Sequence, residues 1–264
     1  MNLPLITLTT DFGLSDEYVG VMKGVIYTIC PTARIVDISH NIRPQDVRQA
    51  ARIIFSSYRY FPAGAIHVVV VDPDVGSSRR IILLEADGHL FLVPDNGVAS
   101  LLLPRTQKIY EIDNTTLYRH PVSPTFHGRD IFAPIAAHLA SHLAPHSAGS
   151  EIARDAPVRL DFAVPSICGN IMRGIVTDID HFGNLITNID KERAGCFCSH
   201  DFHRLKVHAG ALTIHGIVSS YNAVRRDEPL ALFGSRNLLE IGINQGNAST
   251  KLRLGLDSPI CLSI

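Results

Sequence analysis

The sequence predicts two domains of different class: an α/β N-terminal domain with a mostly parallel sheet, and a smaller all-β, barrel-like C-terminal domain. Up to about residue 145, short apolar runs alternate with segments of helical periodicity, which is typical of a mostly parallel sheet with helices on both faces. Beyond Ile167 the apolar runs are short and turn residues recur about every 8–12 positions, as in a small sandwich or barrel. We therefore assign residues 1–148 to the α/β domain, 149–166 to a linker rich in Pro, Ser, Gly and Ala, and 167–264 to the β domain.

The first domain is organised around the segment 65–80, AIHVVVVDPDVGSSRR. Its four consecutive valines predict a strand that is buried on both faces, and Pro73 ends the strand because proline has no N–H to donate. Asp72 is thus expected at the tip of a buried strand, where ligands bind in open α/β sheets. The alternative is that Asp72 only caps the turn that follows.

The other elements are predicted from apolar periodicity and from the turn residues that flank them. In the first domain we expect a strand at 3–10, a helix at 18–29, a strand at 33–39, a helix at 45–61, a hairpin at 81–95, a short helix at 97–103, a strand at 108–113 and a helix at 131–144. In the second domain we expect strands at 170–180, 184–190, 204–210, 211–216, 229–234, 238–244 and 258–264.

Composition and charge restrict the class of protein. The chain has 264 residues, 46% of them hydrophobic, with a net charge of −1 and a pI near 6.9, so neither a nucleic acid nor a membrane surface is the expected partner. No apolar run approaches the roughly 20 residues of a membrane span, and the N-terminus lacks the basic start of a signal peptide. Five cysteines without the spacing of a disulfide framework are typical of a cytoplasmic protein.

Three loops that follow predicted strands carry charged clusters. Because the carboxyl ends of parallel strands meet at one sheet edge, these loops are expected to converge there. A histidine whose ring pairs with a carboxylate is the usual general base near neutral pH. The clusters are Asp11 with Asp16, Asp72 with Arg79, and His127 with Arg129 and Asp130.

His127 and Asp130 have an alternative role as caps of the helix that begins near Ile131, because a helix N-terminus favours an acid. Capping is the role expected of Asp130. For His127, which lies two residues further out and precedes a glycine, we favour a functional role.

Two turns of the second domain carry polar side chains, in DHFGN (180–184) and FGSRN (233–237), and both are also ordinary turn sequences. A rival cluster, CFCSHDFH (196–203), suggests zinc, since Cys196 and Cys198 would share one face of a strand near His200 and His203. The second ligand pair of a structural zinc site is missing, so we expect no metal here.

The motifs together resemble the S-adenosylmethionine (SAM) hydroxide adenosyltransferase family, relatives of the fluorinase and the chlorinase. The resemblance runs in order along nearly the whole chain and covers LTTDFGLSDEYVGVMKGVI, VVVVDPDVGSSRR, VPDNG, TFHGRDIFAPIAAHLA, IDHFGNLITNI and LFGSRNLLEIGIN. It implies an enzyme that cleaves SAM with water to adenosine and L-methionine. It also implies a homotrimer with each site between two subunits, and no cofactor, because SAM is the substrate.

The resemblance also implies roles for individual residues. An activating triad falls on Asp72, Arg79 and His127. Residues that would bind the substrate are Asp11 at the ribose, Asp16 on the methionine side, Asp180 and Asn184 at the methionine amino group and adenine, Tyr221 near the adenine, and Ser235 with Arg236 at the methionine carboxylate.

Two departures bear on the reaction. Halogenating relatives carry tyrosine at the position of Asp72 and another residue at that of His127, so water is favoured over halide. Asp74 stands where the hydrolytic members usually have glycine. The alternatives are a SAM-dependent halogenase, a non-catalytic protein that binds SAM or adenosine, and a zinc hydrolase.

Overall fold

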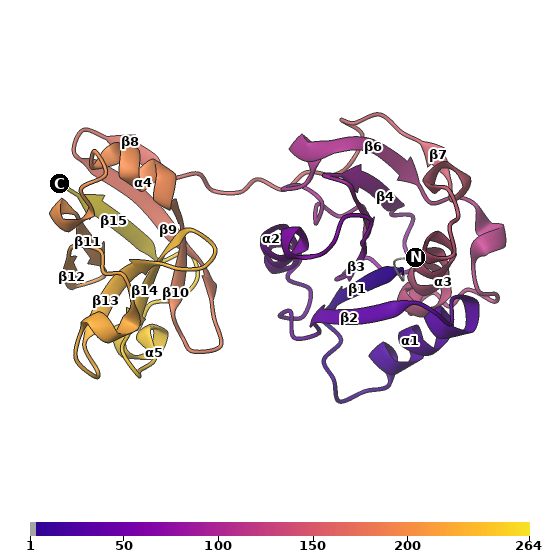
Figure 1. Cartoon of the computed structure of the whole chain (residues 1–264), viewed down its shortest axis with the longest axis horizontal. Coiled ribbons are helices and arrows are strands. Elements are labelled where there is room, and N and C mark those ends of the chain that lie inside the picture. The colour runs from indigo at the N-terminus through magenta and orange to yellow at the C-terminus, as the bar shows by residue number, and fades with distance from the viewer. Residues whose placement is uncertain (1–3) are drawn as a thin grey trace. The chain divides into compact units, whose positions relative to one another are not determined.

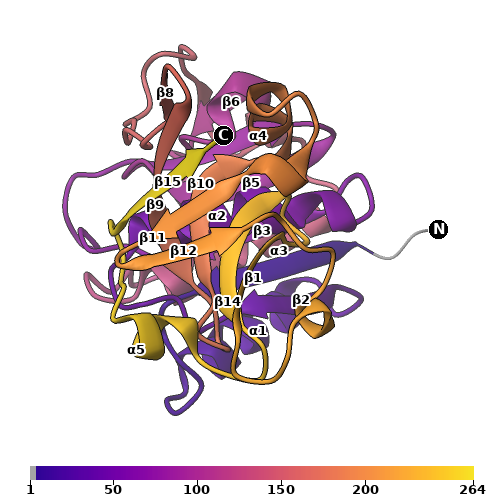
Figure 2. The ribbon, with the colours of Figure 1, turned by 90° about the vertical axis from the view of Figure 1, so that its left-hand side faces the viewer.

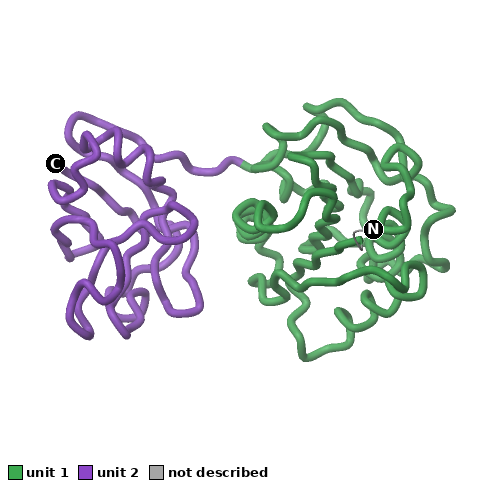
Figure 3. The backbone as a smooth tube through the Cα atoms, viewed as in Figure 1, with its two compact units in different colours: residues 1–160 green, residues 161–264 purple. Residues whose placement is uncertain are grey.

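The computed structural model describes residues 4–264, so only Leu3 of the expected strand 3–10 lies outside the described residues. The chain forms two compact units that divide between Leu160 and Asp161, inside the expected linker (Figure 3). That linker is not free of structure, because strand β7 (Ser150–Glu151) pairs with the sheet of unit 1. Each unit is described below by itself.

Unit 1 is built on a seven-stranded sheet with the order β2-β1-β3-β5-β4-β6-β7 (Figure 1). Five of its strands run in one direction and only β4 and β7 run against them, so the predicted mostly parallel sheet is confirmed. The strands are β1 (Leu5–Thr10), β2 (Arg34–Ser39), β3 (Ile66–Val70), β4 (Ile81–Ala86), β5 (His89–Pro94), β6 (Thr106–Glu111) and β7.

Helices cover both faces of this sheet. Helices α1 (Tyr18–Ile29) and α3 (Ala133–Ala140) pack on one face, where alternate residues of β1 such as Leu8 join the apolar core. Helix α2 (Val47–Ser57) leads to Tyr58, which contacts His67 on the other face. The alternation of side chains along each strand separates these two layers.

Two expected helices differ from the structure. Residues 98–102 form turns that lead into a 3₁₀ helix (Leu103–Arg105), because Pro104 restricts the residue before it and stops a longer helix. The helix expected at 131–144 begins earlier, as a π-helical turn (Gly128–Phe132), and α3 ends where His142 takes a left-handed conformation.

Unit 2 is an all-antiparallel, nearly closed barrel-like sheet with the order β12-β11-β15-β9-β10-β14-β13, with β8 paired to β9 (Figures 1 and 2). This confirms the predicted second domain. The strands are β8 (Ser166–Cys168), β9 (Ile171–Ile179), β10 (Leu185–Asp190), β11 (Lys206–Ala209), β12 (Leu212–His215), β13 (Pro229–Phe233), β14 (Leu238–Ile243) and β15 (Pro259–Ser263).

Two short helices of unit 2, α4 (Lys191–Phe197) and α5 (Ala248–Leu252), were not predicted. Each begins after a capping side chain: Asp190 accepts from the backbone N–H of Arg193, and Asn247 accepts from that of Thr250. Among residues 4–264, no helix is long and apolar enough to cross a membrane.

Candidate active site

The first group of predicted residues lies at the carboxyl edge of the parallel strands in unit 1. Strands β1 and β3 are neighbours, and Thr10 is paired with Val70 at their ends. Asp11 follows β1 directly and Asp72 follows β3 after one more residue, so both acids emerge at the same edge. Asp11 is anchored there because its Oδ2 accepts a hydrogen bond from the backbone N–H of Gln45 at 2.8 Å.

Asp72, Arg79 and His127 form one connected cluster. The guanidinium of Arg79 binds Asp72 with two parallel donors: Nε lies 2.8 Å from Oδ1, and Nη2 contacts Oδ2. Nη2 also lies 2.9 Å from Nδ1 of His127, which comes from a loop 48 positions further along the chain. The side chains of Arg79 and Asp72 are only 7% and 4% exposed, so little solvent screens this ion pair.

The hydrogen bonds assign the protonation state of His127. A guanidinium has only donors, so Nδ1 of His127 must accept from Arg79 and the ring hydrogen lies on Nε2. Burial and the nearby charge of Arg79 lower the pKa of His127, and the carboxylates of Asp72 and Asp130 only partly oppose this. The imidazole is therefore neutral at neutral pH and presents an N–H donor.

The loop that carries His127 is held by Asp130, for which helix capping was the expected role. This prediction was wrong, because the helix begins before Asp130 and the residue is fully buried. Its carboxylate accepts from the side chains of Arg129 and Arg119 and from the backbone N–H of Ser123. Asp130 thus ties both ends of the loop together.

An aromatic cluster beside the site was not predicted. The ring centroids of Phe12, Tyr18 and Phe126 lie 5.1–6.0 Å from one another. Phe12 directly follows Asp11, and Phe126 directly precedes His127. The aromatic residues next to Asp11 and His127 were the sequence signal that could have predicted this cluster. The cluster brings the Asp11 loop against the His127 loop.

The turn after Asp72 accommodates Asp74 without strain. Asp74 is exposed and is absent from the residues with positive φ, so its backbone conformation does not require a glycine. Gly76 is different: its φ is +81°, and a Cβ there would lie 2.2 Å from the carbonyl oxygen of Pro124. Asp16 is exposed on the β1–α1 loop, and its role stays a prediction.

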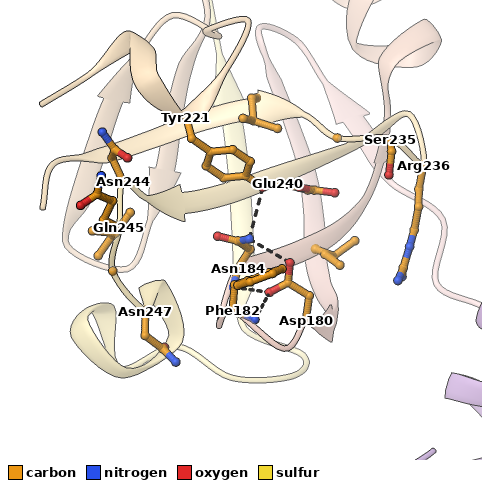
Figure 4. Close-up of a pocket in the computed structure, with 15 residues that line it drawn as sticks. Asp180, Phe182, Asn184, Tyr221, Ser235, Arg236, Glu240, Asn244, Gln245 and Asn247 are labelled. Carbon is orange, nitrogen blue, oxygen red and sulfur yellow. Dashed lines mark hydrogen bonds between the residues drawn. The ribbon is translucent and has the colours of Figure 1, made fainter. Parts of the chain in front are cut away.

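The second group of predicted residues lines a cavity of about 840 Å³ in unit 2 (Figure 4). All five predicted residues of this unit are in its wall: Asp180, Asn184, Tyr221, Ser235 and Arg236. Ser235 and Arg236 lie at one end, on the turn between β13 and β14, and Tyr221 lies further along the wall.

Within this cavity, hydrogen bonds connect four side chains in a row. The amide Nδ2 of Asn184 donates to Asp180 Oδ2 at 2.8 Å and to the hydroxyl oxygen of Tyr221 at 3.2 Å, and that hydroxyl donates to Glu240 Oε2 at 3.0 Å. Asp180 Oδ1 also accepts from the backbone N–H groups of Phe182 and Asn184. Asp180 therefore organises the DHFGN turn as well as lining the cavity.

Glu240 is a site residue that sequence reasoning missed. It is 7% exposed, and its burial and the nearby Asp180 raise the pKa of its carboxyl group. Burial and the carboxylate of Glu240 raise the pKa of Tyr221. The available signal was one acid inside the apolar strand LLEIGIN.

The cysteine cluster differs from the prediction in its local structure. Cys196 and Cys198 lie at the end of helix α4 rather than on a strand, so their sulfurs do not share a face: Cys196 is exposed and Cys198 is buried. Within the described residues, no group of three or more His, Cys, Asp or Glu side chains is arranged to hold a metal ion.

Comparison with known families gives a match in each of the two units. The SAM hydroxide adenosyltransferase N-terminal domain matches residues 6–149, and the C-terminal domain of the same family matches 174–261. The chain therefore belongs to the SAM hydroxide adenosyltransferase family.

Particular relatives are similar over most of their length. The chain is 35% identical to a protein from Thermus thermophilus named (R)-S-adenosyl-L-methionine hydrolase, over 96% of this chain and 97% of that one. A protein of the same name from Salinispora arenicola is 40% identical over 69% of this chain and 70% of its own. A fluorinase from an Actinoplanes species is 32% identical over 73% of this chain and 74% of its own. The crystal structure of an uncharacterized conserved protein from Thermotoga maritima superposes with a TM-score of 0.92 at 34% identity, covering 98% of this chain and all of that one.

Proposed function

We propose that this protein hydrolyses S-adenosyl-L-methionine to adenosine and L-methionine by in-line attack of water on C5′ of the ribose. The observation that carries the proposal is the contact of Asp72, Arg79 and His127 at the carboxyl edge of the sheet. The names of the relatives support the same reaction.

The chemistry needs a positioned water rather than a metal or cofactor, because the sulfonium already makes C5′ electrophilic. Attack forms the C5′–O bond, the C5′–S electrons return to sulfur as a neutral thioether, and the water gives up a proton. Since His127 Nδ1 accepts from Arg79, Asp72 is the proton acceptor we propose, and the Nε2–H of His127 orients the water.

Substrate binding is divided between two groups of residues in this proposal. Asp11 accepts the ribose hydroxyls, and Asp16 contacts the methionine side. In unit 2, Ser235 and Arg236 bind the methionine carboxylate, while Asn184 and Tyr221 face the adenine. A site that holds both ends of SAM also fixes the direction of the S-methyl group, so we expect it to discriminate between the two sulfonium epimers, as the (R) in the relatives' names suggests.

We also propose that the protein is a cytoplasmic homotrimer whose sites form between unit 1 of one subunit and unit 2 of the next. The two residue groups belong to different compact units, so one chain could contribute the first group and its neighbour the second. The five cysteines, all free, support a reducing compartment.

The test is incubation of each SAM epimer with the protein in ¹⁸O-labelled water. Label in the 5′-hydroxyl of adenosine, with one methionine released per adenosine and no loss of rate in EDTA, is the expected result. Formation of 5′-chloroadenosine in chloride would instead indicate a halogenase. SAM binding with no methionine release would indicate a binding protein.

A further inference from the structure

Glu240 is placed in the cavity of unit 2 by strand alternation. Its neighbours Leu239 and Ile241 belong to the barrel core, so Glu240 points to the opposite face of β14. There it is paired with Leu232 on β13 and Ile186 on β10, whose side chains also line the cavity. A carboxylate between two apolar residues is costly to bury unless a cation or donor meets it.

The carboxyl group of Glu240 lies beside the turn that carries Ser235 and Arg236. A Cβ on Gly234 would lie 1.8 Å from Glu240 Oε1, so the carboxyl group packs directly on the backbone that precedes Ser235. Figure 4 shows it pointing toward that end of the cavity. A group bound next to Ser235 and Arg236 is therefore within reach of Glu240.

One oxygen of this carboxylate remains for a ligand. Oε2 accepts from Tyr221, whereas Oε1 has no hydrogen-bond partner among residues 4–264 and is not sealed from the cavity. The carboxylate oxygens of Asp180, by contrast, already accept three hydrogen bonds from Phe182 and Asn184.

The charge of the cavity favours a cationic ligand group. Its wall holds two carboxylates, Asp180 and Glu240, and one cation, Arg236, whose Nη1 also lies 3.3 Å from Asp178 Oδ2. An α-amino acid bound through its carboxylate at Ser235 and Arg236 carries its ammonium one carbon away from that carboxylate.

We propose that Glu240 is a specificity-determining residue that accepts a hydrogen bond from the α-ammonium group of the methionine part of the substrate. This inference rests on the proposed function, and it assigns to Glu240 the ammonium contact that the resemblance implied for Asp180 or Asn184. Ligands without an α-amino group are then bound weakly.

The test compares two ligands that differ only in the amino group, L-methionine and 4-(methylthio)butanoate, by calorimetry on the full chain with adenosine present. The expected result is that Glu240→Gln weakens L-methionine binding about 10- to 100-fold, the range of a charge-assisted hydrogen bond, and leaves 4-(methylthio)butanoate unchanged. Glu192→Gln, which removes an exposed carboxylate on α4, serves as the control and should change neither.

Tyr221→Phe removes the hydrogen bond that Tyr221 donates to Glu240 and keeps the carboxylate of Glu240. It therefore distinguishes a direct contact of Glu240 with the ligand from an indirect effect through Tyr221. Equal weakening of both ligands by Glu240→Gln, or unchanged binding of L-methionine, would overturn the inference. These measurements do not depend on turnover: a protein that binds L-methionine through Glu240 but cleaves no SAM would refute the proposed function and keep the ammonium site.

Discussion

At the scale of single residues, the hydrogen bonds that Arg79 donates determine the roles of Asp72 and His127. A guanidinium that donates to Asp72 and to His127 Nδ1 leaves His127 with a donor at Nε2 and leaves the carboxylate of Asp72 as the acceptor of this cluster. Asp11 has a different environment, since its partner is the backbone N–H of Gln45. The two acids at one sheet edge are thus suited to different tasks.

Replacing each acid should separate turnover from affinity. Asp72→Asn is expected to lower kcat by about 10²- to 10⁴-fold, the range for loss of a general base, with little change in KM. Asp11→Ala is expected mainly to raise KM for SAM. Steady-state kinetics of adenosine release measure both, and Asp155→Asn, an exposed acid outside both residue groups, is the control. Identical effects of the Asp72 and Asp11 substitutions would contradict this division.

At the scale of elements, the turn between β3 and β4 contacts the His127 loop through the backbone of Gly76 as well as through Arg79. Gly76 approaches Pro124, three residues before His127, more closely than any side chain allows. The positive φ of Gly76 adds a second reason for glycine.

Gly76→Ala should therefore both destabilise the protein and lower activity. A positive φ alone costs about 1–2 kcal/mol for alanine, and the displacement of Pro124 adds to that. Gly64→Ala is a matched control, since Gly64 also has a positive φ (+85°) but nothing lies within 4 Å of a Cβ there. Denaturant unfolding and kcat are the measurements. If both variants lost equal stability and kept full activity, the contact with Pro124 would not position His127.

A buried histidine pair between β3 and β5 links stability to pH. His67 is fully buried, with Nδ1 2.8 Å from Thr7 Oγ1 and Nε2 3.3 Å from His89 Nδ1. Burial and the neighbouring His89 lower the pKa of His67 to about 3. Below pH 6.5 the unfolded chain therefore binds a proton that the folded chain excludes, so stability falls as the pH falls from 6.5 toward 3.

His67→Gln should flatten this dependence, because glutamine keeps a polar group near Thr7 and does not titrate. Each pH unit below 6.5 is expected to cost the unsubstituted protein up to about 1.4 kcal/mol through His67. Urea unfolding at pH 7 and pH 5 measures the difference, with the exposed His146→Gln as the control. An unchanged slope in His67→Gln would show that His67 does not cause the acid loss.

At the scale of the whole molecule, the two residue groups lie in two separate compact units, each with its own core. Asp72 belongs to unit 1, and Arg236 belongs to unit 2. In the homotrimer that we propose, each site joins a unit 1 and a unit 2 from different chains, so complementation between variants tests the proposal directly.

Asp72→Asn and Arg236→Ala should each be inactive alone and regain activity when they are co-expressed. In mixed oligomers about a quarter of shared sites would combine an intact unit 1 with an intact unit 2. Light scattering should give a mass near three times the 28.9 kDa of one chain. No recovery of activity in verified mixed oligomers would place each site within a single chain.

Much of this architecture is local information that the sequence carries by itself. Apolar periodicity located the parallel strands and the antiparallel barrel, and α1 has the predicted bounds, because alternation and helical spacing are properties of neighbouring residues. The rule that parallel strands end at one edge predicted that the loops of Asp72, Arg79 and His127 converge, and the family resemblance singled out these three residues, which are in contact.

What the tertiary structure alone decided are features that depend on contacts between distant segments. The burial of Asp130 and the free oxygen of Glu240 in a cavity are set by which side chains meet across the fold. An acid in an apolar strand is visible in the sequence, but whether it faces a core, solvent or a ligand depends on strand order and on packing from other elements.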